Sequence, residues 1–122
     1  MDWLCRVFGF TETLRWTLPD GKVGHSELEL ENGLVMVALG PDGFCMPAQP
    51  TNYSVQIIFF VSDVEEHFRR SKLQDVRIVS EPADKPWGLR QYIALDLEGH
   101  GWEFTQHLRD VSPASWGAKQ MV

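Results

Sequence analysis

The sequence predicts an α+β fold built from two similar units, and three observations support this prediction. Polar and apolar residues alternate along several short segments, which is typical of strands with one buried face. Residues 2–8 and 62–73 instead carry apolar side chains four positions apart, as amphipathic helices do. A helix followed by three strands is expected twice along the chain, which indicates an internal repeat.

The first half of the chain is predicted to form a helix followed by three strands. Leu4 and Phe8 lie on one face of the helix, which Asp2 is placed to cap. Gly9 then ends it. The strands are expected at residues 11–18, 23–30 and 34–39. The last of them is almost wholly apolar, which indicates that both of its faces are covered. The turn before it, Glu31-Asn32-Gly33, is a strong hairpin signal.

The second half is predicted to open with a strand at 54–61 and a helix at 62–73. Ser62 and Glu65 have the spacing of a capping box at the start of this helix. The remaining elements are expected to be a short strand, a polar loop and a closing hairpin, at residues 76–80, 81–85 and 86–104.

The closing hairpin, Pro86 to Phe104, is the most informative stretch of the chain. Its turn is Glu98-Gly99-His100-Gly101, where glycine takes positive φ without steric cost. On the return strand, Glu103 lies on the opposite face from Trp102 and Phe104. Glu103 is therefore either a surface carboxylate on a half-buried sheet or a buried functional one.

The two halves align when Leu4 and Phe8 are matched with Val64 and Phe68. The expected architecture is a tandem pair of βαβββ modules, with the first lacking its opening strand in this chain. Two explanations are open: the natural chain starts upstream, which we expect, or a partner chain covers the exposed edge. The chain is then one domain with a first module, linker, second module and tail at 1–40, 41–53, 54–108 and 109–122.

Composition restricts the class of function. A chain of 122 residues has room for one core, and its net charge of −6 argues against a nucleic-acid partner. No apolar run approaches the roughly 18 residues that a membrane helix needs, and the N-terminus has no signal-peptide pattern. Cys5 and Cys45 are isolated thiols without metal-type spacing, so we expect a cytoplasmic protein with reduced cysteines.

The hairpin pattern PWG-x-R-x-Y-x-x-x-D-x-E-G-H-x-W-E-F resembles the closing hairpin of the vicinal oxygen chelate superfamily. That superfamily groups glyoxalase I, bleomycin-resistance proteins and extradiol dioxygenases. Its usual Asp-Pro-Asp-Gly turn corresponds here to Asp96-Leu97-Glu98-Gly99, in which the proline is replaced. The resemblance extends over nearly the whole chain and is nearest to the bleomycin-resistance-like proteins. It implies the glyoxalase/bleomycin-resistance fold and a homodimer with clefts between two chains.

The resemblance also indicates where a divalent metal would lie. The family motif His-x-x-x-x-Val-x-Asp-Val matches residues 56–64, so Gln56 stands in place of the metal-binding histidine. Glu103 matches the glutamate of the last strand. The strand at 34–39 has neither an acid nor an imidazole, so we expect no cofactor. The alternative is a nickel, zinc, manganese or iron ion held by Glu103 and Gln56.

The candidate ligand-binding residues are polar or aromatic side chains on or beside the strands: Trp16, His25, Glu27, Gln56, Trp87, Arg90, Tyr92, Trp102 and Glu103. His25, Glu27 and Glu29 share a strand face that is either a cleft wall or a solvent-facing polar side. Arg90 and Tyr92 either clamp a polar group or support the turn. The tryptophans line an aromatic pocket or pack the core.

The other three histidines are assigned to structural or surface positions. We expect His67 on a polar helix flank and His107 near the end of the last strand, both at the surface. His100 is expected to form local hydrogen bonds within the turn.

The first functional hypothesis is metal-free binding of a small molecule, cationic or aromatic, in a sheet-lined cleft. The alternative is a divalent-metal-dependent lyase, isomerase or dioxygenase of the glyoxalase type. A third possibility is a subunit whose cup is filled by its own side chains. The sequence identifies no catalytic residue.

Overall fold

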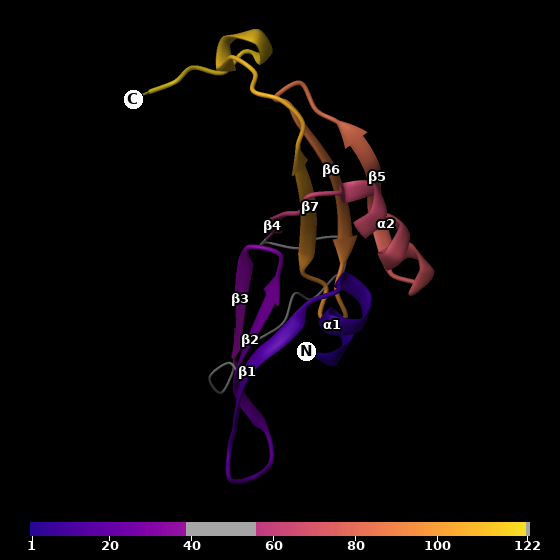
Figure 1. Ribbon diagram of the computed structural model, residues 1–122, viewed down its shortest axis with the longest axis vertical. Helices are drawn as coiled ribbons and strands as arrows, with labels where there is room; N and C mark the ends of the chain where they lie inside the picture. The colour runs from indigo at the N-terminus through magenta and orange to yellow at the C-terminus, as the bar shows by residue number, and fades with distance from the viewer. Residues whose placement is uncertain (39–55, 122) are drawn as a thin grey trace.

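The computed structural model describes residues 1–38 and 56–121 and contains two sheets (Figure 1). The elements in chain order are α1 (Asp2–Phe8), β1 (Thr11–Thr17), β2 (Val23–Leu30), β3 (Gly33–Ala38), β4 (Gln56–Phe60), α2 (Val64–Leu73), β5 (Arg77–Asp84), β6 (Leu89–Leu95), β7 (Gly101–His107) and the 3-10 helix η1 (Pro113–Trp116). The predicted linker at 41–53 lies outside the described residues. Neither α-helix is long and apolar enough to cross a membrane, nor is any other helix in the described ranges.

The sheet topology confirms the predicted α+β fold with its internal repeat. The first sheet has the antiparallel order β1-β2-β3, and the second has the order β4-β7-β6-β5 with β4 parallel to β7. In the described residues, the first module is therefore a helix and three strands, and the second is a complete βαβββ unit. The opening strand of the second module pairs with the last strand of the same module.

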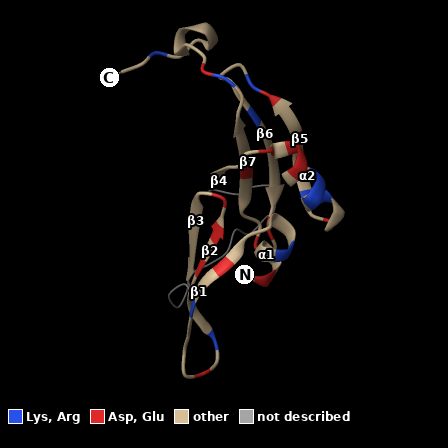
Figure 2. Ribbon diagram, in the orientation of Figure 1, with Lys and Arg blue, Asp and Glu red and all other residues tan. Residues whose placement is uncertain are grey.

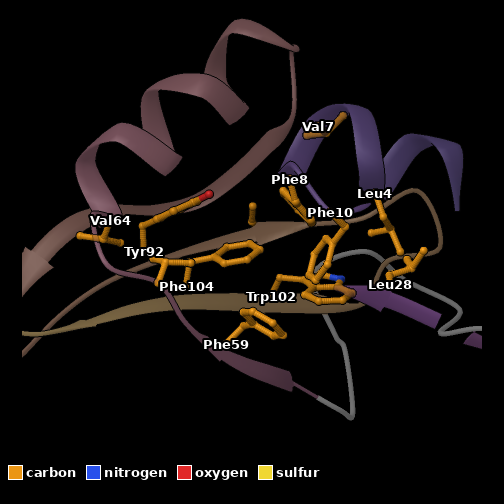
Figure 3. Close-up of a cluster of buried hydrophobic side chains, with 12 residues drawn as sticks. Leu4, Val7, Phe8, Phe10, Leu28, Phe59, Val64, Tyr92, Trp102 and Phe104 are labelled. Atoms are coloured by element: carbon orange, nitrogen blue, oxygen red, sulfur yellow. The ribbon is translucent and has the colours of Figure 1, made fainter. Parts of the chain in front are cut away.

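The two modules share one aromatic core (Figure 3). Phe8, at the end of α1, lies 4.8 Å from Phe104 and 5.6 Å from Trp102 between ring centroids. Phe10 packs in turn against Phe59, at 5.2 Å. The helix of the first module thus covers the sheet of the second. Burial of these side chains removes a large apolar area from water, which stabilises both modules together.

The helix ends differ in part from the predicted ones. Gly9 ends α1 in the left-handed conformation, with φ of 83°, as predicted. Asp2 does not cap α1, because it lies inside the first turn. The cap of α2 is Asp63, whose carboxylate accepts from the Glu66 N–H, rather than Ser62. Ser62 is already engaged, since its N–H and hydroxyl both donate to Glu31 in the β2–β3 turn.

Strand β5 is longer than the sequence predicts. It continues through the expected loop to Asp84, with irregular pairing between Ser80 and Ala83. Pro82 is compatible with this strand because β5 lies at the edge of its sheet, where a missing N–H breaks no ladder hydrogen bond.

The prediction that β3 is covered on both faces is wrong. Val35 and Val37 pack against the core, whereas Leu34 and Met36 are 47% and 62% exposed. An apolar run shows that both faces of a strand can be buried. Both faces are buried only where other elements pack on each side of the sheet. Here only one face is covered by the core.

The prediction that His67 lies at the surface is also wrong. His67 is buried between the two modules, where its Nε2 donates to the Phe8 carbonyl at 2.7 Å. Its Nδ1 therefore accepts from the Tyr92 hydroxyl at 2.6 Å, and Tyr92 in turn lies 3.0 Å from the Ser71 hydroxyl. Carbonyl groups in the last turn of a helix lack hydrogen-bond partners within that helix. His67 of α2 provides a partner for the Phe8 carbonyl at the end of α1.

Candidate functional site

The face of the second sheet that points away from the helices carries the strongest candidate site. Gln56, Ile58 and Phe60 alternate with the core residues of β4 and therefore lie on this face. Across the sheet, Ile58 pairs with Glu103 of β7, and Glu103 pairs with Ile93 of β6. We call the five residues Gln56, Ile58, Phe60, Ile93 and Glu103 the Glu103 face.

Glu103 is the central polar group of the Glu103 face. The amide Nε2 of Gln56 donates to Glu103 Oε2 at 2.5 Å. Both cross-strand neighbours of Glu103 are isoleucines, and Glu103 itself is half-buried. A carboxylate in such surroundings is held in a defined orientation and accepts further hydrogen bonds from a donor that approaches the face.

Ile58 and Phe60 are site residues that the sequence analysis did not single out. Each is 57% exposed, although large apolar side chains in sheets are usually buried. The alternation along β4 could have identified them, because both residues lie on the same face of the strand as Gln56, opposite the buried Phe59. The sequence alone does not reveal that this face of the strand is exposed to solvent.

A groove of about 690 Å³ adjoins the Glu103 face between strands β3 and β4. Its walls are mainly apolar and include Leu34, Val35, Ile58 and Phe60. Ile58 and Phe60 belong to both the Glu103 face and the groove, whose lining also includes the polar residues Glu31, Asn32 and Gln106.

The first sheet carries the second candidate group. His25 Nε2 lies 3.6 Å from Glu27 Oε1, and His25 pairs across the sheet with Trp16, which is 58% exposed. Glu27 lies between Leu14 and Met36, which are also exposed. We call the set Leu14, Trp16, His25, Glu27 and Met36 the His25 face. Figure 2 shows acidic residues on β2, the central strand of this sheet.

The other predicted ligand-binding residues make structural contacts. Tyr92 and Trp102 are 0% and 2% exposed and belong to the core, because they alternate onto the helix side of their strands. Arg90 forms ion pairs with Glu65 and with Asp84 on the same side. Trp87 contacts Trp116 of the tail, with 5.8 Å between ring centroids. These four side chains therefore do not line the Glu103 face.

The hairpin turn is organised by Asp96. Its carboxylate accepts hydrogen bonds from the Glu98 and His100 backbone N–H groups and from the Trp102 indole. The His100 imidazole lies 3.1 Å from the same carboxylate, which confirms the predicted local role of this histidine. His107 is exposed beside Asp110, also as predicted.

Comparison with known proteins places the chain in a family. A model of the Glyoxalase/Bleomycin resistance protein/Dioxygenase superfamily matches residues 1–104. The chain belongs to this superfamily. This membership confirms the resemblance that the closing hairpin indicates.

Individual members of the superfamily resemble the chain to different degrees. The crystal structure of TioX from Micromonospora sp. ML1 is 44% identical, covers 91% of this chain and 87% of that chain, and gives a TM-score of 0.69. The Mycobacterium tuberculosis (strain ATCC 25618 / H37Rv) protein Rv0887c is 28% identical over 117 residues, which are 92% of this chain and 69% of that protein. TnmS3 from Streptomyces sp. CB03234, described as an antibiotic binding protein, is 21% identical, with 87% and 82% coverage and a TM-score of 0.63.

The residues present do not fit a divalent metal at the place that the superfamily resemblance implies. There Gln56 turns an N–H toward Glu103, and a metal ligand would have to turn its carbonyl oxygen to the ion. Across residues 1–38 and 56–121, no group of three or more His, Cys, Asp and Glu side chains is placed to hold an ion. One carboxylate and one amide are too few donors for a stable site.

Proposed function

We propose that this chain is a metal-free binding protein of the bleomycin-resistance type, holding a small molecule of cationic or aromatic character. The observation that carries the proposal is the exposure of Ile58 and Phe60 around the Gln56–Glu103 pair. Exposed apolar surface next to a few oriented polar groups is the usual composition of a ligand site. TnmS3, which shares the fold, is described as an antibiotic binding protein, and this supports the proposal of a binding role.

The metal-free proposal is tested by metal content after reconstitution with nickel, zinc, manganese or iron and removal of free ion. We expect no stoichiometric retention, because within the described part of the chain only Gln56 and Glu103 offer donor atoms at this position. The matched variant is Glu103→Ala, which should leave the result unchanged. Stoichiometric metal that is lost in Glu103→Ala would contradict the proposal and favour the lyase, isomerase or dioxygenase alternative. Turnover assays would then follow.

We further propose that two copies associate as a homodimer, with ligand clefts between them. The support is the apolar surface of the first sheet, where Leu14, Trp16 and Met36 are 45%, 58% and 62% exposed. An exposed patch of this kind is typical of an interaction surface.

The dimer is tested by substituting a charged residue into that patch. Met36→Asp places a second carboxylate beside Glu27, its cross-strand neighbour, so we expect the dimer to dissociate. The measurement is the solution mass by light scattering. Leu73→Asp is the control, because Leu73 is equally apolar and 80% exposed but lies on α2. A monomeric wild-type protein, or equal effects of both substitutions, would contradict the dimer proposal.

A further inference from the structure

The Glu103 face contains a carboxylate that forms no ion pair with a Lys, Arg or His of residues 1–38 and 56–121. Ile58 and Ile93 flank Glu103 on the adjacent strands, and Gln56 is neutral. Arg90, on strand β6, is paired with Glu65 and Asp84 on the opposite side of the sheet. In the described residues, the Gln56 amide is the hydrogen-bond donor that meets the Glu103 carboxylate.

Covering this carboxylate with an apolar ligand is costly unless the ligand supplies a partner. A buried charge that is neither paired nor hydrogen-bonded is strongly unfavourable, whereas a charge-assisted hydrogen bond is shorter and stronger than a neutral one. Gln56 donates one hydrogen bond to Oε2 of Glu103, and the carboxylate can accept further hydrogen bonds. An anionic ligand would meet an uncompensated like charge, and the chain already carries a net charge of −6.

The side chains around Glu103 determine the rest of the ligand. Ile58 and Phe60 are both more than half exposed and follow one another along one face of β4. Together they offer an apolar surface on which a flat ring can lie while a substituent reaches the carboxylate.

We propose that the ligand of the Glu103 face carries a protonated nitrogen, an amine or an amidinium, on a flat apolar body. This inference rests on the proposed binding function and specifies the class of ligand. Glu103 accepts the charged N–H group, Gln56 keeps the carboxylate oriented, and Ile58 and Phe60 contact the apolar body.

The test uses three probes of nearly the same shape and different charge: benzamidinium, benzamide and benzoate. Each is titrated into the full chain in buffer with a chelator, and binding is followed by NMR shifts of the β4 and β7 backbone amides. We expect benzamidinium to bind about tenfold more tightly than benzamide, as a charge-assisted hydrogen bond implies, and benzoate to bind most weakly.

Two variants assign the preference to Glu103. Glu103→Gln is expected to abolish the preference for benzamidinium while benzamide still binds. Glu98→Gln removes the same charge from the exposed turn and should keep the preference. Ile58→Ser should weaken benzamidinium and benzamide alike, because it removes apolar contact. Retention of native amide shifts in each variant shows that it is folded.

The outcomes separate this inference from the proposed function. Equal binding of the three probes, or a preference that survives Glu103→Gln, would overturn the ligand class and leave small-molecule binding in place. Absence of binding by all three probes would overturn both.

Discussion

Replacement of Trp102 by alanine is expected to lower the free energy of unfolding by about 3–5 kcal/mol, the range for a large aromatic residue removed from a core. Trp102 is 2% exposed and packs against Phe8, Phe10 and Phe104. Its indole N–H also donates to Asp96 at 2.9 Å, so the substitution removes a hydrogen bond from the hairpin turn. The measurement is equilibrium unfolding in urea.

Trp87→Ala is the matched control for this prediction. Trp87 is 40% exposed and contacts the tail rather than the core, so its removal should cost less than about 1 kcal/mol. Equal losses for the two variants would show that the shared core does not dominate stability. Loss of stability in Trp102→Ala should be accompanied by disorder in both modules, because Phe8 and Phe10 belong to the first and Phe104 to the second.

Mild acid is expected to destabilise the protein through His67. Burial lowers the pKa of His67 to about 4, although the hydrogen bond to the Phe8 carbonyl opposes this shift. The unfolded chain therefore binds more protons than the folded one between the ordinary histidine pKa of about 6.5 and 4. Stability is complete above this interval and decreases as the pH falls through it. The expected loss is about 2–3 kcal/mol, since one pKa unit corresponds to about 1.4 kcal/mol.

The physical cause is the arrangement of donors around the imidazole. Neutral His67 donates to Phe8 and accepts from Tyr92, whose hydroxyl lies within hydrogen-bond distance of Ser71. Protonation places a second N–H against the Tyr92 hydroxyl and a charge in the core. Among nearby charged groups, Arg70 opposes protonation and Glu31 favours it. Burial raises the pKa of Tyr92, so this hydroxyl remains a donor over the whole interval.

The acid prediction is checked by urea unfolding between pH 7 and pH 4, with His67→Gln as the variant. Glutamine retains hydrogen-bonding groups but does not titrate. The His67→Gln variant should therefore be less stable than the wild type at neutral pH, and its free energy of unfolding should vary less with pH over this interval. Identical pH profiles for both proteins would contradict the assignment to His67.

Protonation of Glu12 lowers the stability at a lower pH than protonation of His67, because hydrogen bonds from Arg15 and Ser26 hold the pKa of Glu12 at about 2.

The polar pair of the candidate site could be predicted from the sequence, but the exposure of the apolar residues around it could not. The motif match assigned Gln56 and Glu103 to the family's metal-binding positions, and the structure brings the two side chains into contact. Tyr92 and Trp102 were equally reasonable ligand contacts by residue type, but both face the helices. Alternation shows that Trp102 and Glu103 point to opposite sides of the sheet. It does not show which side the helices cover.

By itself, the sequence determined the local elements and the chemistry available to them. Alternation predicts the strands, Gly9 ends the first helix, and the match of Leu4 and Phe8 with Val64 and Phe68 predicts the repeat. Only the tertiary structure decided that His67 is buried and that Ile58 and Met36 are exposed. The reason is that periodicity records which residues share a face, whereas burial depends on what packs over that face from elsewhere in the chain.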